Sequence, residues 1–526
     1  MTVQNFSLKD EYWENFQLKP EDVEFLYNYL LETETPQTSQ ELLDVLVTNR
    51  IREEKQAIEK RRGAGGKMYI PKDHYEVGQT LIFPSLGWAR GEVLEVRPGN
   101  NPEMPAFRVL KVELEGGSVR EFASGIANHK LNNPQAFVQE ESLLSSDEVL
   151  ATYGKLLSER LDAGLRNNEE FIIIAGRWFP KALLVNVNVG HLNLAEALLD
   201  MEGGGPLPTK KLLEAVELPS NINSKLVEFS LDYALWKDGR FDEVGPAGKI
   251  LWYLKRLEPN EVLNVPDHLN YYDISHERVA FTGDMLALEQ SLDDELSPLE
   301  GASTGSEVQI KLIYPHWRSG TLPLSSRLHS LFPTAYRTAR IRFILVDGET
   351  GNKFPGWVVR EHKYVYGLRE FYEQKGIFPG SLLTIRKSNT PGEVIIEAHS
   401  RRPAREWVRT VLVGADGGIV LAMLKQIVAS NFDDRMAIVV PDQAALDNLW
   451  KKIKTERIPF ERTVVDMLRE LAKLNPQGHV HASELYATVN LVRRCPPGPL
   501  LALLASRPWF VHVGDLHYRF DDSERN

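Results

Sequence analysis

Residues 351–387 read GNKFPGWVVREHKYVYGLREFYEQKGIFPGSLLTIRK, and this stretch decides how the rest of the chain is interpreted. WVVR and LLTIRK have the branched and aromatic residues of short strands, and GLREFYEQKG between them has helical apolar spacing. Before this stretch, VQIKLIY and RIRFILVD predict two more strands, and SSRLHSLF predicts a second helix. EVIIEAH follows as a further strand. Residues 308–410 are therefore expected to form a β-rich domain with two short helices.

The pattern of this domain resembles the plant B-three DNA-binding pseudobarrel and the related effector domains of restriction enzymes. The shared features are a helix from Pro323 to Phe332, a strand ending at Trp357, the helix entry Tyr366-Gly367-Leu368, and a G-x-x-P-G-x-x-L strand start from Gly376 to Leu383. The loop HKYVYG is shorter than in the plant pattern, which leaves the second base-reading loop open. The resemblance implies a domain that reads double-stranded DNA with two loops.

The resemblance also assigns DNA-binding residues to this sequence. One loop follows the opening strand and the other follows the strand that ends at Arg360, while arginines nearby are expected to contact phosphates. Arg340 and Arg342 share one strand face by their spacing of two, although a merely solvated strand face explains them equally well. The basic tract 401–405 could track a DNA backbone or be a linker. The predicted site residues are His316, Trp317, Arg318, Arg327, Arg340, Arg342, Arg360, His362 and Lys363, with Arg337 as a further phosphate candidate.

Two other regions share one order of elements, namely three helices followed by a β-ribbon. The first spans 166–262 and starts with FIIIAGRWF, and the second spans 459–526. RFDEVG and WFVHVG align at the entry to the two ribbons, with Phe241 matching Phe510 and Gly245 matching Gly514. Both regions resemble the winged helices of the delta subunit of bacterial RNA polymerase and of the HARE family. Their third helices carry few cations, so they could bind either flanking DNA or protein.

The whole chain is predicted to be an α+β multidomain protein built from winged helices, a small β-barrel and a B-three-like DNA-binding pseudobarrel. Five short strands between turns predict the barrel, which resembles Tudor or KOW domains. The expected parts are a helical region 1–66, the small β-barrel 67–134, a helical linker 135–165, the winged helix 166–262, an acidic linker 263–307, the pseudobarrel 308–410, an α/β connecting segment 411–458 and the C-terminal winged helix 459–526.

Charge is unevenly distributed along the 526 residues. The chain has 61 Lys and Arg against 73 Asp and Glu, a net charge of −12, yet residues 308–410 hold 17 basic and 8 acidic residues, a balance of +9. Residues 284–307 carry seven carboxylates and no basic residue. This segregation favours one cationic working face on an acidic scaffold. We therefore hypothesise that the acidic segment covers the basic domain.

Composition also limits the compartment and the chemistry. A single cysteine, Cys495, excludes a disulfide framework and fits a reducing cytosol, so the expected location is cytoplasmic. No run of 18 apolar residues is present, and the first residues lack the pattern of a signal peptide. We predict no membrane partner, no catalytic residues, no metal and no cofactor.

The leading hypothesis is a non-enzymatic, sequence-selective protein that binds double-stranded DNA, in bacterial transcription regulation or genome defence. One alternative is an acidic interaction factor that associates with RNA polymerase or another protein partner. The other is the DNA-recognition effector of a restriction-type system whose nuclease lies on a separate chain.

Overall fold

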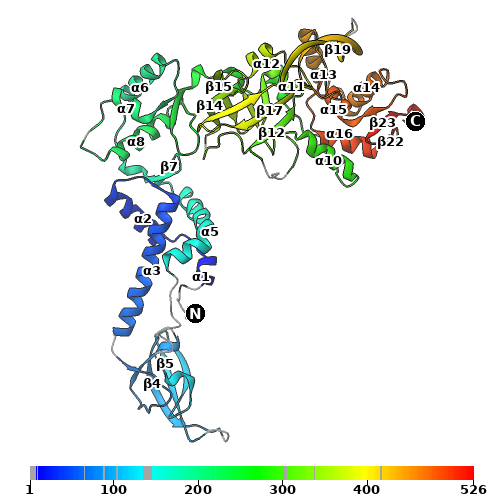
Figure 1. The fold of residues 1–526 in the computed structure, drawn as a ribbon. Coiled ribbons are helices and arrows are strands. Elements are labelled where there is room, and N and C mark those ends of the chain that lie inside the picture. The colour runs from blue at the N-terminus through cyan, green and yellow to red at the C-terminus, as the bar shows by residue number, and fades with distance from the viewer. Residues whose placement is uncertain are drawn as a thin grey trace. The chain divides into compact units, whose positions relative to one another are not determined.

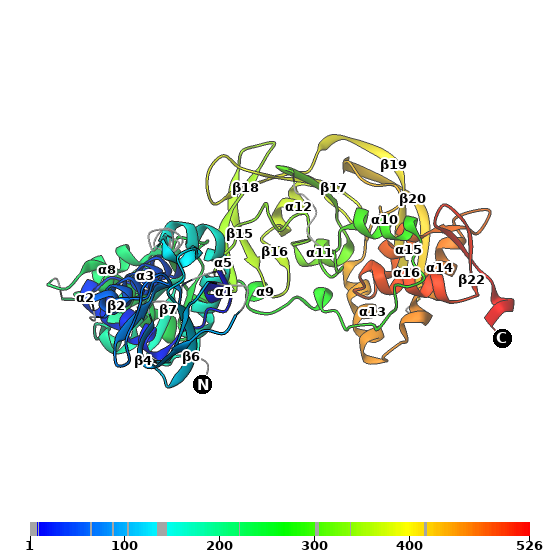
Figure 2. The same ribbon diagram turned by 90° about the horizontal axis from the view of Figure 1, so that it is seen from below.

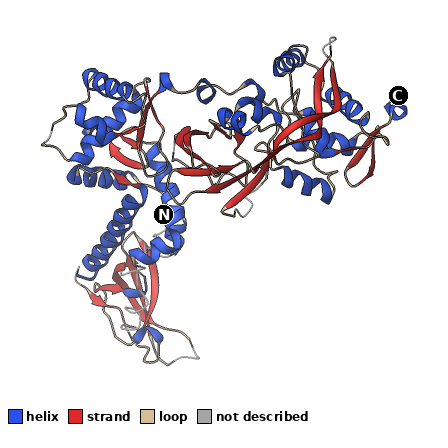
Figure 3. Ribbon diagram, turned by 45° about the horizontal axis from the view of Figure 1, so that its top comes forward, coloured by secondary structure: helices blue, strands red, loops and turns tan. Residues whose placement is uncertain are grey.

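Helices and strands alternate along the whole chain, which has a mixed α and β fold (Figure 1; Figure 3). The computed structural model describes residues 8, 10–63, 66–86, 89–101, 105–133, 145–219, 221–299, 305–336, 338–414 and 418–525. Contacts divide the chain into one unit of residues 1–186 and 219–230 and a second unit of residues 187–218 and 231–526. Each unit is described by itself below.

The first unit contains an arrangement that we call a helix–ribbon module: helix, short strand, two helices and a two-stranded ribbon. Its short strand pairs antiparallel with the second ribbon strand, so the sheet order is β1-β8-β7. A helix α1 (Asp10–Glu14) comes first. The elements of this first module are α2 (Pro20–Thr33), β1 (Gln37–Thr38), α3 (Ser39–Gly63), α5 (Ser146–Arg166), β7 (Phe171–Ile174) and β8 (Arg177–Pro180).

This pairing corrects the expected start of the first repeat at residue 166. FIIIAGRWF forms β7 and β8, and β8 pairs with β1, where Trp178 lies opposite Gln37, 141 positions earlier, rather than with the ribbon that follows. Helix α5, expected as part of a linker, packs against α3 and buries Leu157 and Leu161. Sequence spacing alone could not show this, because the partners of α5, β7 and β8 lie on the far side of an insertion.

The insertion is a small sheet of its own between α3 and α5. Its strands lie in the order β2-β3-β4-β5-β6, all antiparallel except the β2–β3 pair. Tyr69, Phe83 and Val112 lie in its buried core. Tyr69 Oη donates to the carbonyl of Ala123, which ties the first strand region to the last. The strands are β2 (Lys67–Met68), β3 (Thr80–Phe83), β4 (Ala89–Pro98), β5 (Arg108–Leu114) and β6 (Ser118–Ser124).

A second helix–ribbon module follows, with the sheet order β10-β11-β9. Its short strand again pairs antiparallel with the second ribbon strand. Apolar side chains of α6, α7, the last part of α8 and both ribbon strands form its core. The elements are α6 (Val189–Met201), β9 (Leu207–Pro208), α7 (Thr209–Ala215), α8 (Ser224–Lys237), β10 (Phe241–Glu243) and β11 (Leu251–Leu254).

The predicted β-rich domain forms a seven-stranded sheet that curls into a half-barrel. The strand order is β12-β17-β18-β14-β15-β16-β13, antiparallel apart from the parallel β14–β18 pair. Alternate residues of β14 point into a core that includes Ile341, Phe343 and Leu345. The elements are β12 (Glu307–Lys311), α11 (Tyr314–Ser319), β13 (Thr321–Pro323), β14 (Arg340–Asp347), β15 (Lys353–Val359), β16 (Tyr364–Tyr366), α12 (Arg369–Lys375), β17 (Leu382–Lys387) and β18 (Glu393–Glu397).

The helix predicted from Pro323 to Phe332 is wrong, because residues 326–331 form turns and no helix is present at 324–332. Ser325 Oγ and Ser326 Oγ both donate to the carboxylate of Asp293. These two bonds tie the start of the predicted helix to Asp293, so tertiary contacts set the path of the chain here. The apolar residues that suggested a helical face, Leu328 and Phe332, pack into the half-barrel core from these turns.

The segment expected as an acidic linker is folded over most of its length. After a short helix α9 (Asn260–Leu263), helix α10 (Gly283–Leu292) buries Met285 and Glu289, and Glu289 pairs with Arg278. The chain then places Asp293, Asp294 and Glu295 at buried positions. These residues bind cations of the half-barrel and of the C-terminal region, as described below.

A long antiparallel ribbon follows the half-barrel and crosses the expected boundary between residues 410 and 411. Its strands are β19 (Ser400–Val413) and β20 (Ile419–Ser430), which Figure 2 shows side by side. Val411, Ile419 and Leu421 near its turn pack into the C-terminal core. Helix α13 (Gln443–Thr455) completes the segment expected as a connection.

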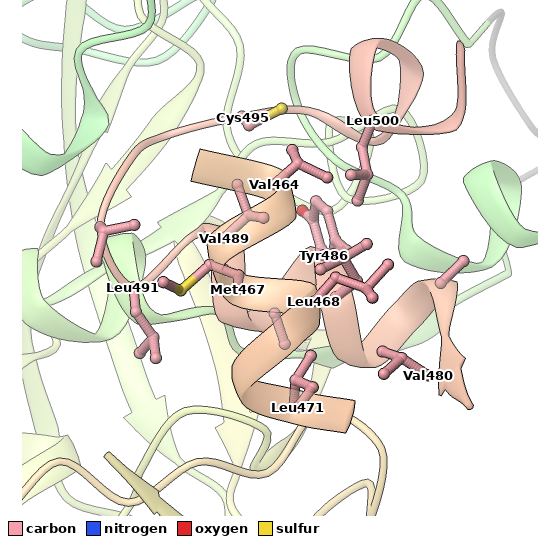
Figure 4. Close-up of a cluster of buried hydrophobic side chains, with 14 of the residues drawn as sticks. Val464, Met467, Leu468, Leu471, Val480, Tyr486, Val489, Leu491, Cys495 and Leu500 are labelled. Atoms are coloured by element: carbon pink, nitrogen blue, oxygen red, sulfur yellow. The ribbon is translucent and has the colours of Figure 1, made fainter. Parts of the chain in front are cut away.

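The C-terminal region is a third helix–ribbon module with the sheet order β21-β23-β22. Helix α14 places a continuous apolar face against α15, and Val464, Leu468, Tyr486 and Leu500 lie in the buried cluster of Figure 4. Burial of this face supplies most of the driving force for its folding. The elements are α14 (Phe460–Ala472), β21 (Val480–His481), α15 (Ala482–Val489), α16 (Pro497–Ser506), β22 (Phe510–Gly514) and β23 (His517–Phe520).

Candidate nucleic-acid interface

The predicted first DNA-reading loop is helix α11 in the structure. His316 has no exposed surface: its Nε2 lies 3.2 Å from Glu295 Oε1, and its Nδ1 lies 2.9 Å from the hydroxyl of Thr321. Trp317 Nε1 donates to the carbonyl of Ile377 at 2.7 Å, and Arg318 pairs with Asp447 at 2.6 Å. These three side chains hold α11 in place and leave little surface for a ligand.

The strand face of Arg340 and Arg342 lies against the second helix–ribbon module. Arg340 lies 2.5 Å from Asp242 and 3.0 Å from Glu258, and only 19% of its side chain is exposed. The Arg342 guanidinium lies over the rings of Tyr253 and Trp357, at 5.4 Å and 5.9 Å from their centroids. Burial lowers the pKa of Arg342. This face is an intramolecular interface in the structure.

Two carboxylates of that interface are shifted by their surroundings. Burial raises the pKa of Glu243 to about 7, and the Thr338 hydroxyl donates to its Oε2. Burial, together with the negative charge of Asp242, also raises the pKa of Glu258. Arg340, Glu243 and Glu258 therefore lie close together between the half-barrel and the ribbon β10–β11.

Of the other residues predicted to bind DNA, two bind other parts of the protein and two are exposed. Arg327 Nε lies 3.0 Å from Asp293. In the second predicted loop, Arg360 donates to the carbonyl of Thr338 at 2.9 Å. His362 and Lys363 are exposed in the turn between β15 and β16, where Lys363 has a φ of 53° and its Nζ donates to the carbonyl of Glu295. Arg337 lies outside the described residues.

Three consecutive carboxylates join the half-barrel to the third module. Arg494 is fully buried and lies 2.7 Å from both Asp294 and Glu295, while Tyr486 Oη donates to Asp294 at 2.5 Å. Burial by itself raises the pKa of Glu295. The charges of Arg494 and His316 outweigh this effect and hold the pKa of Glu295 far below its ordinary value. The network ties residues 293–295 to both neighbours, so these acids are not a loose cover over a basic surface.

An exposed cationic and aromatic face lies instead on the ribbon β19–β20. Arg405 pairs with Ile427 and Trp407 with Lys425 across the ribbon, which places all four side chains on one face. Trp407 is 62% exposed and Ile427 is 71% exposed. Lys425 Nζ lies 5.4 Å from the centre of the Trp407 ring. We call Arg405, Trp407, Lys425 and Ile427 the ribbon face.

The sequence carried a partial signal for this face. The basic tract 401–405 marked one end of it, with Arg402 also exposed. Lys425, however, lies 20 residues beyond Arg405, inside an apolar run, and only the ribbon register brings the two together. The tract was predicted either to track a backbone or to be a linker, and the structure places it in strand β19.

Comparison with protein-family models, with curated proteins and with solved structures finds no match to this chain. Among the described residues, no group of three or more His, Cys, Asp or Glu side chains is placed to hold a metal ion. None of the described helices combines the length and the apolar character needed to cross a bilayer.

Proposed function

We propose that this chain is a non-enzymatic protein that binds double-stranded DNA, and that the ribbon face and the neighbouring Arg402 make the contact. The half-barrel is then a B-three-like pseudobarrel and the three helix–ribbon modules are winged helices. In the half-barrel, the Arg340–Arg342 face packs against the second module, and the side chains of 316–318 bind Glu295, Ile377 and Asp447. The proposal therefore moves the contact to the ribbon.

The observation that carries the proposal is the composition of the ribbon. Arg402, Arg405 and Lys425 are exposed, while Glu406, the ribbon's carboxylate, pairs with Arg401 at 2.8 Å. A two-stranded β-ribbon fits the major groove of B-DNA, and clustered cations bind its phosphates. Trp407 adds a flat ring that can pack on a sugar or base edge.

A second candidate function, docking of a protein partner, is favoured by exposed apolar residues farther along the ribbon. Leu412 and Val420 are 41% and 47% exposed next to the turn, and Met423 is 42% exposed. Exposed Trp, Met and Arg with few acids are typical of the centre of a protein interface. An RNA-polymerase-associated role would use this surface.

The two candidates differ in their salt dependence. We would titrate fluorescent random-sequence duplex DNA with the full chain at two salt concentrations and follow its anisotropy. The triple variant R402E/R405E/K425E should lose at least tenfold in affinity. It should also reduce the slope of log K against log salt by about 3, roughly one unit for each phosphate contact removed.

The matched control reverses three exposed cations of the first unit, in the variant K155E/R166E/K181E. It changes net charge by the same amount and should keep affinity within threefold. Equal losses in both triple variants would mean that only net charge matters, and no duplex binding at low salt would refute the DNA proposal.

A further inference from the structure

A cavity of about 540 Å³ opens beside the third helix–ribbon module. Small-molecule sites commonly have volumes of about 300–1,000 Å³. The cavity lies between the end of α13, the turn into α14 and the loop that joins α15 to α16, all within the second unit. The lining residues used below are Asp267, Tyr272, Trp450, Lys454, Arg457, Phe460, Arg493 and Arg494.

The lining is strongly cationic. Arg494 is paired with Asp294 and Glu295, whereas Lys454, Arg457 and Arg493 face a single lining carboxylate, Asp267, whose Oδ1 lies 3.6 Å from Lys454 Nζ. One weakly paired acid cannot balance three cations. Charge of this density favours a ligand with two negative charges, such as a phosphate, because arginine donors match phosphate oxygens in geometry and charge.

Arg457 has a left-handed backbone conformation that normally favours glycine. It follows the C-cap of α13 with a φ of 51°, and its amide donates to the carbonyl of Lys454. This left-handed position after a helix is usually glycine, since other residues are strained there. An exposed arginine at this position lowers the stability of the fold. Such strain is typical of residues whose side chains bind a ligand.

Arg494 supports the wall of the cavity from behind. Its Nη atoms bind Asp294, Glu295, Asn490 Oδ1 and the carbonyl of Cys495. Its Nε is buried and has no hydrogen-bond partner among the described residues. Because the Arg494 side chain has no accessible surface, it holds residues 490–495 in place behind the cavity and leaves phosphate binding to Lys454, Arg457 and Arg493.

Aromatic side chains form the rest of the wall. Tyr272 is 64% exposed at the rim, and Trp450 and Phe460 lie deeper. The Arg493 guanidinium stacks 5.6 Å from the centre of the Phe460 ring and donates to the carbonyl of Ile458. Flat rings beside phosphate-binding cations are the pattern by which proteins hold a nucleobase and its phosphate together.

We propose that this cavity binds a nucleoside 5′-monophosphate group, with the base against the aromatic wall and the phosphate on Lys454, Arg457 and Arg493. The group comes either from a free nucleotide or from the 5′-phosphorylated end of a nucleic-acid strand. The inference does not depend on DNA binding by the ribbon face, because different residues carry it.

Calorimetric titration of the full chain would test the proposal. The probes are a nucleoside 5′-monophosphate, the nucleoside alone, inorganic phosphate, and a single-stranded hexanucleotide with and without a 5′-phosphate. We expect the monophosphate to bind at least tenfold more tightly than the nucleoside or phosphate. Preference for the phosphorylated hexanucleotide over the free nucleotide would identify a strand end as the source, and the reverse would identify a metabolite.

Arg457→Gly is the decisive variant, since glycine suits the left-handed backbone and should raise the melting temperature while weakening binding at least tenfold. K451Q/K452Q, on the same helix but outside the lining, should leave binding unchanged. The proposal fails if no probe binds at millimolar concentration, if inorganic phosphate binds as well as the nucleotide, or if Arg457→Gly binds normally. Duplex binding that survives Arg457→Gly but not the ribbon triple variant would leave the ribbon proposal intact.

Discussion

Arg494 shows how single residues hold the second unit together. Its guanidinium is buried with Asp294 and Glu295, residues 199 or more positions away in sequence. The two carboxylates also bind Tyr486 and His316, so one side chain connects the third module, the 293–295 segment and the half-barrel. Buried charges of this kind are costly unless every partner is present.

Arg494→Ala should therefore lower the free energy of unfolding by about 3–5 kcal/mol, because it leaves two carboxylates buried without their cation. Urea unfolding followed by circular dichroism measures the loss. The control is Arg462→Ala, whose side chain is 70% exposed and pairs with Asp466 at 3.9 Å. It should cost less than about 0.5 kcal/mol. A loss below about 1 kcal/mol for Arg494→Ala would contradict a structural role for the network.

The stability of the fold should depend on pH through Glu243. Its pKa is raised to about 7 in the fold, from an ordinary 4.5, so between these values the folded state binds a proton more tightly than the unfolded state. The stability it contributes is complete below pH 4.5 and is lost as the pH rises through 7. Glu243→Gln, which stays neutral, should melt at the same temperature as the natural chain at pH 4.5 and at a higher temperature at pH 8.5. A constant difference in melting temperature at both pH values would show that Glu243 does not titrate in this way.

Among the elements, close approach of two backbone segments fixes the chain that follows the ribbon against the half-barrel. Gly380, just before β17, has a φ of 97°, and its amide donates to the carbonyl of Leu312 at 2.7 Å. A Cβ at this position would lie 2.4 Å from the Cα of Ala437. The G-x-x-P-G pattern in the sequence thus has a local cause in this structure, independent of any family.

Gly380→Ala should destabilise the chain by about 3 kcal/mol, through backbone strain and steric overlap together. Gly392→Ala is the matched control, because its φ is 83° but open space surrounds the added Cβ. It should cost about 1 kcal/mol from strain alone. Comparison of denaturant midpoints separates the two terms, and equal losses would show that the contact with Ala437 relaxes.

Across the whole molecule, three helix–ribbon modules have the same order of elements, and the first two also share a set of side-chain contacts. In the first, Trp178 Nε1 donates to Ser39 Oγ and Asp162 Oδ1. In the second, Trp252, Thr209 and Asp232 make the same contacts from the same elements. The third module has Ala482 and Tyr518 at the positions of the hydroxyl and the tryptophan. The described part of the chain thus contains three modules of one arrangement, with other domains in and between them.

The small sheet inserted in the first module should be dispensable for folding. Its core and its ties, such as the bond from Lys72 N to Asn132 Oδ1, lie within residues 67–134. Replacing these residues with a short Gly/Ser linker should leave the remaining thermal transition within about 2 °C, since 1 kcal/mol shifts the melting temperature of a large domain by roughly 2–4 °C. Loss of the whole transition would show that the insertion supports α3 and α5.

The sequence predicted the fold class better than it predicted the candidate sites. Strand and helix periodicity located most of the half-barrel, but charge counting treated every arginine of 308–410 as free. Arg318, Arg327 and Arg340 each have a carboxylate partner distant in sequence, from 34 to 129 residues away. A one-dimensional charge count contains no information on such pairs, and it therefore overestimated the cationic surface of this domain.

The sequence by itself determined the mixed α and β class, the local strands of the half-barrel, and the matching ribbons at Phe241 and Phe510, because each depends on neighbours within a few residues. Only the tertiary structure decided that β7 and β8 pair with β1, that residues 293–295 are buried with Arg494, and that Arg405 and Lys425 share one face. These contacts join positions 20 to 200 residues apart. Their free energy arises from burial and pairing across space, which local sequence patterns do not encode.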